Sequence, residues 1–193
     1  NAGLQVPDDV TLIWCDDNYG YIRHFPTAEE RARKGGNGIY YHVSYWGRPH
    51  DYLWLGTFSP YLLHQQMKLA YDRGIQKMWV LNVGDIKPAE YQIELFLDMA
   101  WNIDEVNEIG VTAHLKSWLG REFGSNCAEE LLPAMEAHYQ LSYIRKPEFM
   151  GNTREEERDP KYKVIKDLPW SEQTISERLR SYTVLSDVVE RME

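Results

Sequence analysis

Three short polar clusters follow apolar stretches of this sequence, and their side chains could bind or hydrolyse a sugar. The first cluster is Asp16, Asp17 and Asn18, which ends the apolar stretch 10–15. Carboxylates can act as general acid, general base or electrostatic stabiliser, and a neighbouring amide can hold a sugar hydroxyl. Consecutive acidic and amide residues are also common in turns. Because the cluster follows a buried strand, we expect Asp16 and Asn18 to face a cleft and Asp17 to hold the loop.

The second cluster lies within the stretch 38–46, where His42 alternates with tyrosine side chains. Alternation along a strand places His42 on one face with Ser44 and Trp46, which favours a polar cleft wall. A histidine between tyrosines is equally compatible with a satisfied core residue. Tyr45 and Trp46 could stack on the faces of pyranose rings, although aromatic side chains also fill cores.

The third cluster belongs to the apolar stretch 77–83 and the residues that follow it. Asn82 is a polar residue inside this stretch. A buried amide needs partners, so Asn82 either ties strands together or faces the cleft. Asp85 and Lys87 come next, and Lys87 could pair with an anionic substrate group or with Asp85.

Three strand–helix units are needed to position these clusters. Parallel strands that deliver polar side chains at their carboxyl ends are typical of a (β/α)8 barrel, whose active sites lie at that end. Thr27 and Glu30 predict a capping box at the start of the first helix. Two further helices are predicted after Pro60 and Pro88, with inward stripes of Leu63, Met67 and Ala70 in one and of Ile93, Phe96, Leu97 and Ala100 in the other. After Gly110 the strand signal disappears and the pattern becomes helical, with helices expected at 112–123 and 128–143. We therefore predict an α/β fold in which residues 1–105 form the C-terminal part of a (β/α)8 TIM-type barrel and residues 106–193 form an α-helical segment. A complete barrel needs about 250 residues, so we expect the chain to be a piece of a larger protein.

Charge and composition argue against several classes of function. The formal net charge is −9, and the pI near 5.2 disfavours a nucleic-acid surface or an anionic membrane surface. No apolar stretch approaches the length of a membrane span. The 6 histidines and 2 cysteines show no spacing typical of a metal site, and we expect neither a metal nor another cofactor.

Five ordered motifs in the first hundred residues point to a known family. They are WCDDNYGYIR at 14–23, PT with ER at 26–31, GGNGIYYH at 35–42, SYWG at 44–47 and NVGDIKP at 82–88. In order and spacing they resemble glycoside hydrolase family 115, the xylan α-1,2-glucuronidases. The resemblance is dense from about residue 10 to residue 100 and thinner through the helical remainder.

The resemblance implies an inverting enzyme that removes glucuronic acid, or its 4-O-methyl form, from glucuronoxylan. It also implies a catalytic (β/α)8 barrel followed by a helical domain. By similarity, the pocket for the uronic acid and the attacking water is lined by Asp16, Asn18, His42, Tyr45 and Asn82. Together with the residue patterns, this leads us to expect catalytic roles for Asp16, His42 and Asn82, and substrate binding by Asn18, Tyr45, Trp46, Arg48, Asp85 and Lys87.

An inverting glycosidase needs two carboxyl groups about 6.5–9.5 Å apart, one acid and one base. The resemblance places the family's principal acidic residues on strands before this chain, which makes Asp16 a supporting carboxylate. We therefore expect the chain to have no activity by itself. An anionic substrate also calls for cationic groups, and Arg23, Arg48 and Lys87 are candidates, although each is a typical surface ion-pair partner as well.

The expected partner is the polysaccharide glucuronoxylan, with no nucleic acid and no membrane. Because xylan lies outside the cell, we expect a secreted or periplasmic protein, and a homodimer of the full-length protein is a further hypothesis. The rival interpretation is a non-catalytic carbohydrate-binding or scaffold segment that keeps the aromatic residues and lacks the acid pair. A phosphate-binding barrel is disfavoured because the glycine-rich stretch 35–38 precedes a strand instead of linking a strand to a helix.

Overall fold

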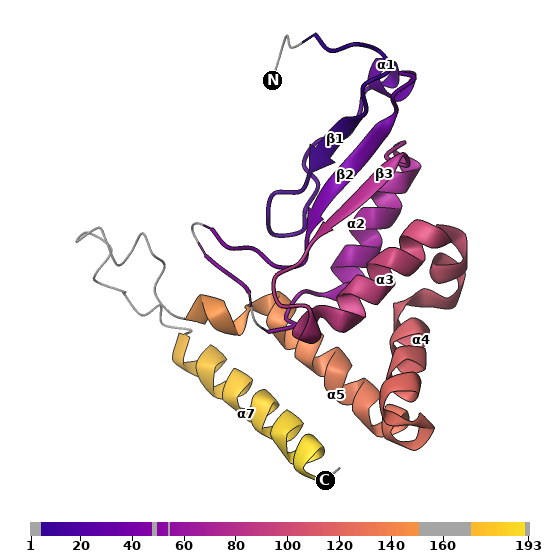
Figure 1. Ribbon diagram of the computed structural model, residues 1–193. Coiled ribbons are helices and arrows are strands. Elements are labelled where there is room, and N and C mark those ends of the chain that lie inside the picture. Colours follow the sequence, from indigo (N-terminus) through magenta and orange to yellow (C-terminus); the bar gives the residue numbers. More distant parts are fainter. Residues whose placement is uncertain (1–4, 48–49, 54, 151–170, 192–193) are drawn as a thin grey trace, which may run out of the picture. The chain divides into compact units, whose positions relative to one another are not determined.

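The computed structural model describes residues 5–47, 50–53, 55–150 and 171–191 (Figure 1). The chain divides into two compact units. The first comprises Asn1–Tyr45 and Pro60–Ile109, and the second comprises Trp46–Ser59 and Gly110–Glu193. The predicted boundary near residue 105 concerns the domains of a longer protein, and it stays a prediction.

The first unit contains a parallel sheet of three strands in the order β1-β2-β3. The strands are β1 (Leu12–Cys15), β2 (Asn37–His42) and β3 (Met78–Asn82). β2 lies in the middle, and five of its six residues are buried, which fits the apolar character of buried parallel strands. The mixed α/β fold with a parallel sheet is confirmed, whereas the barrel is taken up below as a proposal.

The register of the sheet brings the three polar clusters to one edge. Cys15 pairs with Tyr40, and His42 pairs with Asn82. Because all three strands run in the same direction, their carboxyl ends meet at the same edge of the sheet. Asp16, His42 and Asn82 therefore come from neighbouring strand ends.

Short sequence signals mark the starts of the two helices that connect the three strands. Thr27 caps α1 (Ala28–Arg31) with the predicted capping box, in which Thr27 and Glu30 exchange hydrogen bonds. The next helix, α2 (Pro60–Asp72), buries the predicted stripe completely, with Leu63, Met67 and Ala70 at 0 % exposure. A run of three apolar residues at helical spacing, opened by a proline in the first turn, was enough to predict this helix.

The buried face of the following helix differs from the predicted one. A 3-10 turn, η1 (Lys87–Ala89), leads into α3 (Glu90–Trp101), which buries Tyr91, Gln92, Leu95, Phe96 and Met99. Ile93, Phe96, Leu97 and Ala100 were expected to point inward, but Leu97 is 56 % exposed. The observed face includes the polar Gln92, which is 1 % exposed, so a search for apolar residues at helical spacing favours the other face. The ring of Phe96 lies 5.6 Å from that of Trp79 on β3, and this packing belongs to the observed face.

The second unit is helical in the part of the chain that the structure describes. It contains the C-terminal part of α4 (Ile103–Phe123), then α5 (Ser125–Ile144), the 3-10 helix η2 (Pro147–Met150) and α7 (Ser171–Glu190). Gly110 interrupts α4 with φ 76°, where the chain passes from the first unit into the second segment of the second unit. The predicted helices at 112–123 and 128–143 are confirmed with wider bounds.

Within this unit α7 packs against α5. Arg178 Nη2 of α7 donates to the carbonyl oxygens of Leu141 and Arg145 at 3.2 and 2.6 Å, where α5 ends. The Leu141 carbonyl also accepts the N–H of Arg145 at 3.1 Å, whereas the Arg145 carbonyl lies at the C-cap, where a helix supplies no N–H of its own. Among the helices of the described ranges, none is both long enough and apolar enough to cross a membrane.

Gly38 offers a test of how closely the strands must approach one another. A Cβ at this position would lie 2.4 Å from Met78 O and 2.7 Å from Ile13 Cδ1, one contact on each neighbouring strand. We expect Gly38→Ala to lower the free energy of unfolding by about 1–3 kcal/mol in chemical denaturation, because the backbone must shift.

Gly120→Ala is the matched control, since its Cβ would meet only Ala128 Cβ at 4.0 Å and it lies inside α4. That variant should leave stability unchanged or raise it by up to about 1 kcal/mol. Equal losses in the two variants would contradict the close approach at Gly38.

Candidate functional site

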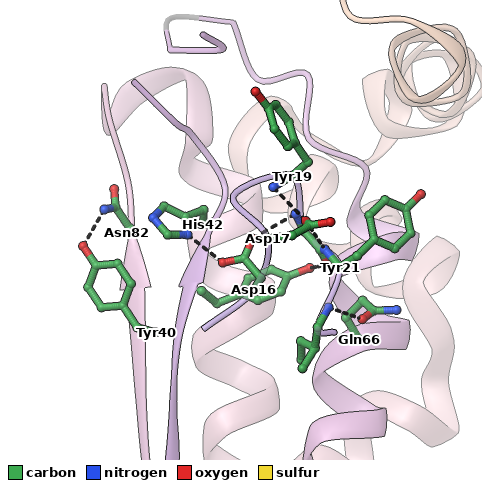
Figure 2. Close-up of polar contacts among 11 residues, drawn as sticks. Asp16, Asp17, Tyr19, Tyr21, Tyr40, His42, Gln66 and Asn82 are labelled. Carbon is green, nitrogen blue, oxygen red and sulfur yellow. Dashed lines mark hydrogen bonds and ion pairs between the residues drawn. The ribbon is translucent and has the colours of Figure 1, made fainter. Parts of the chain in front are cut away.

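A buried carboxylate–imidazole pair forms the centre of the site in the first unit (Figure 2). Asp16 Oδ1 lies 2.6 Å from His42 Nδ1, and the Asp16 side chain has no exposed surface, whereas the His42 side chain is 10 % exposed. The second oxygen, Asp16 Oδ2, accepts the backbone N–H of Gly20 at 2.9 Å. Both oxygens of Asp16 are therefore used inside the protein.

This pair fixes the proton on the imidazole. A carboxylate accepts hydrogen bonds and does not donate them, so His42 Nδ1 carries the hydrogen that faces Asp16. His42 Nε2 then acts as an acceptor in the neutral ring and as a donor in the imidazolium. Asp16 thus orients His42 instead of presenting a carboxylate of its own.

The polar loop after β1 is held by Asp17. Asp17 Oδ1 accepts the backbone N–H groups of Tyr19 and Tyr21, both at 3.1 Å, and Oδ2 pairs with Arg23 at 2.7 Å. The Asp17 N–H donates to the carbonyl of Tyr21 at 2.9 Å. The side-chain contacts agree with the loop-holding role predicted for Asp17, and Arg23 is occupied by an ion pair.

Asn18 sits at the turn of this loop in a left-handed conformation, with φ 70°. Among the described residues other than glycine, only Asn18 has a positive φ. Asparagine tolerates this region better than most residues, because its short side chain can hydrogen-bond locally. Residues other than glycine with a positive φ are often found at functional sites, which agrees with the substrate-binding role predicted for Asn18.

Asn82 lies on the other side of His42 and bonds to a tyrosine that the sequence pattern had not singled out (Figure 2). Asn82 Nδ2 donates to Tyr40 Oη at 2.5 Å, and the rings of Tyr40 and His42 meet edge to face at 5.1 Å. The signal that could have found Tyr40 was its place two residues before His42, on the same face of β2. Four side chains from three strand ends therefore form one continuous polar row, and they are Asp16, His42, Tyr40 and Asn82.

Tyr45 forms an aromatic wall beside this row. Its ring meets Tyr19 at 5.8 Å and His42 at 5.7 Å between centroids, and both contacts are edge to face. Such pairs contribute about 0.5–1.5 kcal/mol beyond area burial. Tyr45 therefore links the loop after β1 to the row after β2.

The remaining predicted residues do not join this row. Asp85 and Lys87 are exposed, and Lys87 pairs with Glu90 at 2.7 Å, where Asp85 was the expected protein partner. Trp46 belongs to the second unit and is 72 % exposed. Arg48 lies outside the described residues.

A row of one carboxylate, one imidazole, one amide and one phenol beside an aromatic wall suits a polyhydroxylated ligand. The hydroxyl and amide groups can donate and accept, and aromatic rings complement the C–H faces of a sugar. The arrangement agrees with the carbohydrate site that the sequence predicts, and that role stays a prediction.

Comparison with known proteins gives the family. The sequence model of glycosyl hydrolase family 115 matches residues 1–149. The chain belongs to glycosyl hydrolase family 115. None of the curated proteins matches it.

A solved structure is closely similar to this chain. It is a family GH115 4-O-methyl-alpha-glucuronidase, BtGH115A, with specificity for decorated arabinogalactans. The two share 75 % sequence identity at a TM-score of 0.92, over 98 % of this chain and 25 % of that one. The present chain therefore spans about a quarter of the length of its solved relative.

In the second unit, the loop that contains Trp46 is held by Lys146, between α5 and η2. Lys146 Nζ lies 4.8 Å from the ring centre of Tyr52 and 5.3 Å from that of Phe58, and it donates to Thr57 O at 2.9 Å. Burial lowers the pKa of Lys146 to about 8, and the nearby Glu148 carboxylate opposes that shift in part. A cation enclosed by two rings and a carbonyl thus anchors the loop to the end of α5.

The lowered pKa makes the stability of this unit depend on pH. Between pH 8 and about 10.5 the unfolded chain binds a proton at Lys146 that the folded chain has lost, so the free energy of unfolding rises with pH. Across that pH range we expect the free energy of unfolding of wild type to rise by up to about 3 kcal/mol more than that of Lys146→Met, measured by urea denaturation. Lys68→Met, which removes a more exposed lysine paired with Asp72, should show no such gain. Parallel pH curves for wild type and Lys146→Met would contradict this assignment.

Proposed function

We propose that the longer protein to which this chain belongs is an α-glucuronidase that removes glucuronic acid or 4-O-methylglucuronic acid from a decorated polysaccharide. The observation that carries the proposal is the Asp16–His42 pair beside Asn82, at one sheet edge of a family 115 chain. The 75 % identity to a 4-O-methyl-alpha-glucuronidase supports it.

We infer that the three parallel strands are the C-terminal units of a (β/α)8 barrel, with residues 106–193 in a helical domain. The polar row lies at the carboxyl ends of the strands, where active sites of such barrels occur. In the part of the chain that the structure describes, the outer strands β1 and β3 each pair with a strand on one side only. This agrees with further strands elsewhere in the longer protein.

In the proposed site, Asp16 is a supporting residue that holds His42, while His42 and Asn82 face the uronic acid. Asn18 and Tyr45 complete the sugar contacts. The mechanism is inversion, in which one carboxylic acid protonates the leaving oxygen and one carboxylate activates water on the opposite face. Since Asp16 uses both oxygens internally, the acid and the base come from other parts of the longer protein, and the chain alone is inactive.

Two substrates follow from different arguments. The solved relative is specific for decorated arabinogalactans, and its high identity favours that class of polysaccharide. The motifs of the sequence favour glucuronoxylan. Both polymers are extracellular, so we propose a secreted or periplasmic protein.

The alternative is a non-catalytic carbohydrate-binding segment. The internal use of both Asp16 oxygens favours it, because the pair then serves to hold a sugar and not to transfer protons. Binding of a uronic acid without its release would support this alternative.

Uronic acid release by the full-length protein tests the proposal. We expect release from decorated arabinogalactan or glucuronoxylan, and a loss of about 100-fold or more in kcat/KM for Asp16→Asn. The asparagine amide would donate to His42 Nδ1 and force the hydrogen onto Nε2, which reverses what the ring offers to the site. Asp72→Asn, which breaks only the exposed pair with Lys68, should retain full activity. An active Asp16→Asn enzyme would remove Asp16 from the working site.

The stereochemistry of the product tests the mechanism separately. Inversion at an α-linked uronic acid releases the β anomer first, and the α anomer then appears only by mutarotation. Proton NMR spectra recorded within the first minutes of reaction distinguish the two. Initial release of the α anomer would establish retention and would call for carboxyl groups only about 5–5.5 Å apart.

A further inference from the structure

One residue of the loop after β1, Gly20, is held at both its backbone N–H and its backbone carbonyl. The hydroxyl of Tyr41 donates to Gly20 O at 2.7 Å, while the N–H of Gly20 donates to Asp16 Oδ2 at 2.9 Å. Asp16 continues to His42, and His42 follows Tyr41 directly on β2. The contacts form a closed ring that starts and ends on adjacent residues of one strand.

The ring is buried along its whole length. Tyr41 has 0 % exposure, Gly20 is buried, and the Asp16 side chain has no exposed surface. Hydrogen bonds in such surroundings are not weakened by competing water, and connected bonds reinforce one another. Loss of one bond leaves a buried group unsatisfied, which is costly.

Adjacent residues of a strand point to opposite faces of the sheet. Tyr41 therefore reaches the loop from the face away from the site, and His42 reaches it from the site. The Gly20 backbone adopts φ 92°, a conformation that suits glycine and few other residues. In this conformation the N–H of Gly20 faces Asp16 while its carbonyl faces Tyr41.

A second anchor comes from α2. Gln66 Oε1 accepts the N–H of Ile22 at 2.9 Å, and both residues are buried (Figure 2). A buried glutamine in the middle of an apolar helix face needs such a partner. The loop is thus fixed to β2 at Gly20 and to α2 at Ile22, two residues apart.

We propose that Tyr41 and Gln66 are positioning residues for the reaction, because they fix the loop 16–23 from which Asp16 holds His42 and at whose turn Asn18 lies. Tyr41, which is wholly buried, acts through Gly20 and Asp16, while Gln66 acts through Ile22. This inference rests on the proposed function, since it assigns these residues to the uronic acid site.

A purely structural role would lower stability and leave the reaction of the folded enzyme unchanged. A positioning role affects kcat, because displacement of reacting groups by about 1 Å can cost about 100-fold in rate.

The test uses the full-length protein with Tyr41→Phe, which removes one hydroxyl and keeps the ring. We expect kcat/KM to fall by about 10-fold to 100-fold, mostly through kcat and with little change in KM. Tyr91→Phe is the control, because Tyr91 is also buried in this unit, at 2 % exposure on α3. The control should change kcat/KM less than about twofold.

Gln66 provides an independent pair of variants. Gln66→Met removes the acceptor for Ile22 and should lower kcat/KM in the same way as Tyr41→Phe. Gln66→Glu keeps an acceptor oxygen at that place and should restore most of the activity. Equal losses for the methionine and glutamate variants would overturn the positioning role of Gln66.

Amide hydrogen exchange, followed by mass spectrometry, reads the loop without any substrate. Tyr41→Phe and Gln66→Met should accelerate exchange in the peptide that spans residues 16–23, while Tyr91→Phe should not. Unchanged exchange and unchanged kcat in Tyr41→Phe would overturn the inference. If the wild-type protein releases no uronic acid, the proposed enzymatic function fails, and accelerated exchange would then still support the anchoring of the loop.

Discussion

The contact between Asp16 and His42 is the constraint on which the first unit depends. A carboxylate with no exposed surface is costly unless charged or polar partners surround it, and here an imidazole and a backbone N–H do so. These partners lie 26 and 4 residues away in the chain, so the pair can form only when β1 and β2 are in register. The contact at the site and the pairing of β1 with β2 therefore depend on each other.

Much of this arrangement could be predicted because it depends on local pattern. Polar residues after apolar stretches predicted that Asp16 and Asn82 would follow or end strands, and the box between Thr27 and Glu30 predicted the start of α1. The use of both Asp16 oxygens could not be predicted. The contact with His42 joins segments 26 residues apart, and no spacing in the sequence encodes which atoms meet there. The bond between Tyr40 and Asn82, 42 residues apart, was missed for the same reason.

Sequence neighbours do not always share a structural unit. Tyr45 belongs to the first unit and Trp46 to the second, although a single peptide bond joins them. The loop 46–59 is held within the second unit by Lys146 and by His138, whose Nε2 lies 3.0 Å from Gly56 O. Strand alternation predicted that Trp46 shares a face with His42. In the structure β2 ends at His42, so the alternation does not extend to Trp46.

The close approach at Gly38 has a consequence for how this family can change over time. At Gly38, four residues before His42, β2 lies too close to both neighbouring strands to shift, so the segment 38–42 has a fixed length and register. One residue inserted there would turn the imidazole away from the candidate site and place a phenol in it. Insertions beyond the strand ends leave this register unchanged. New substrate preferences are therefore expected to arise in the loops by gain or loss of whole segments, while the strands accept substitutions only.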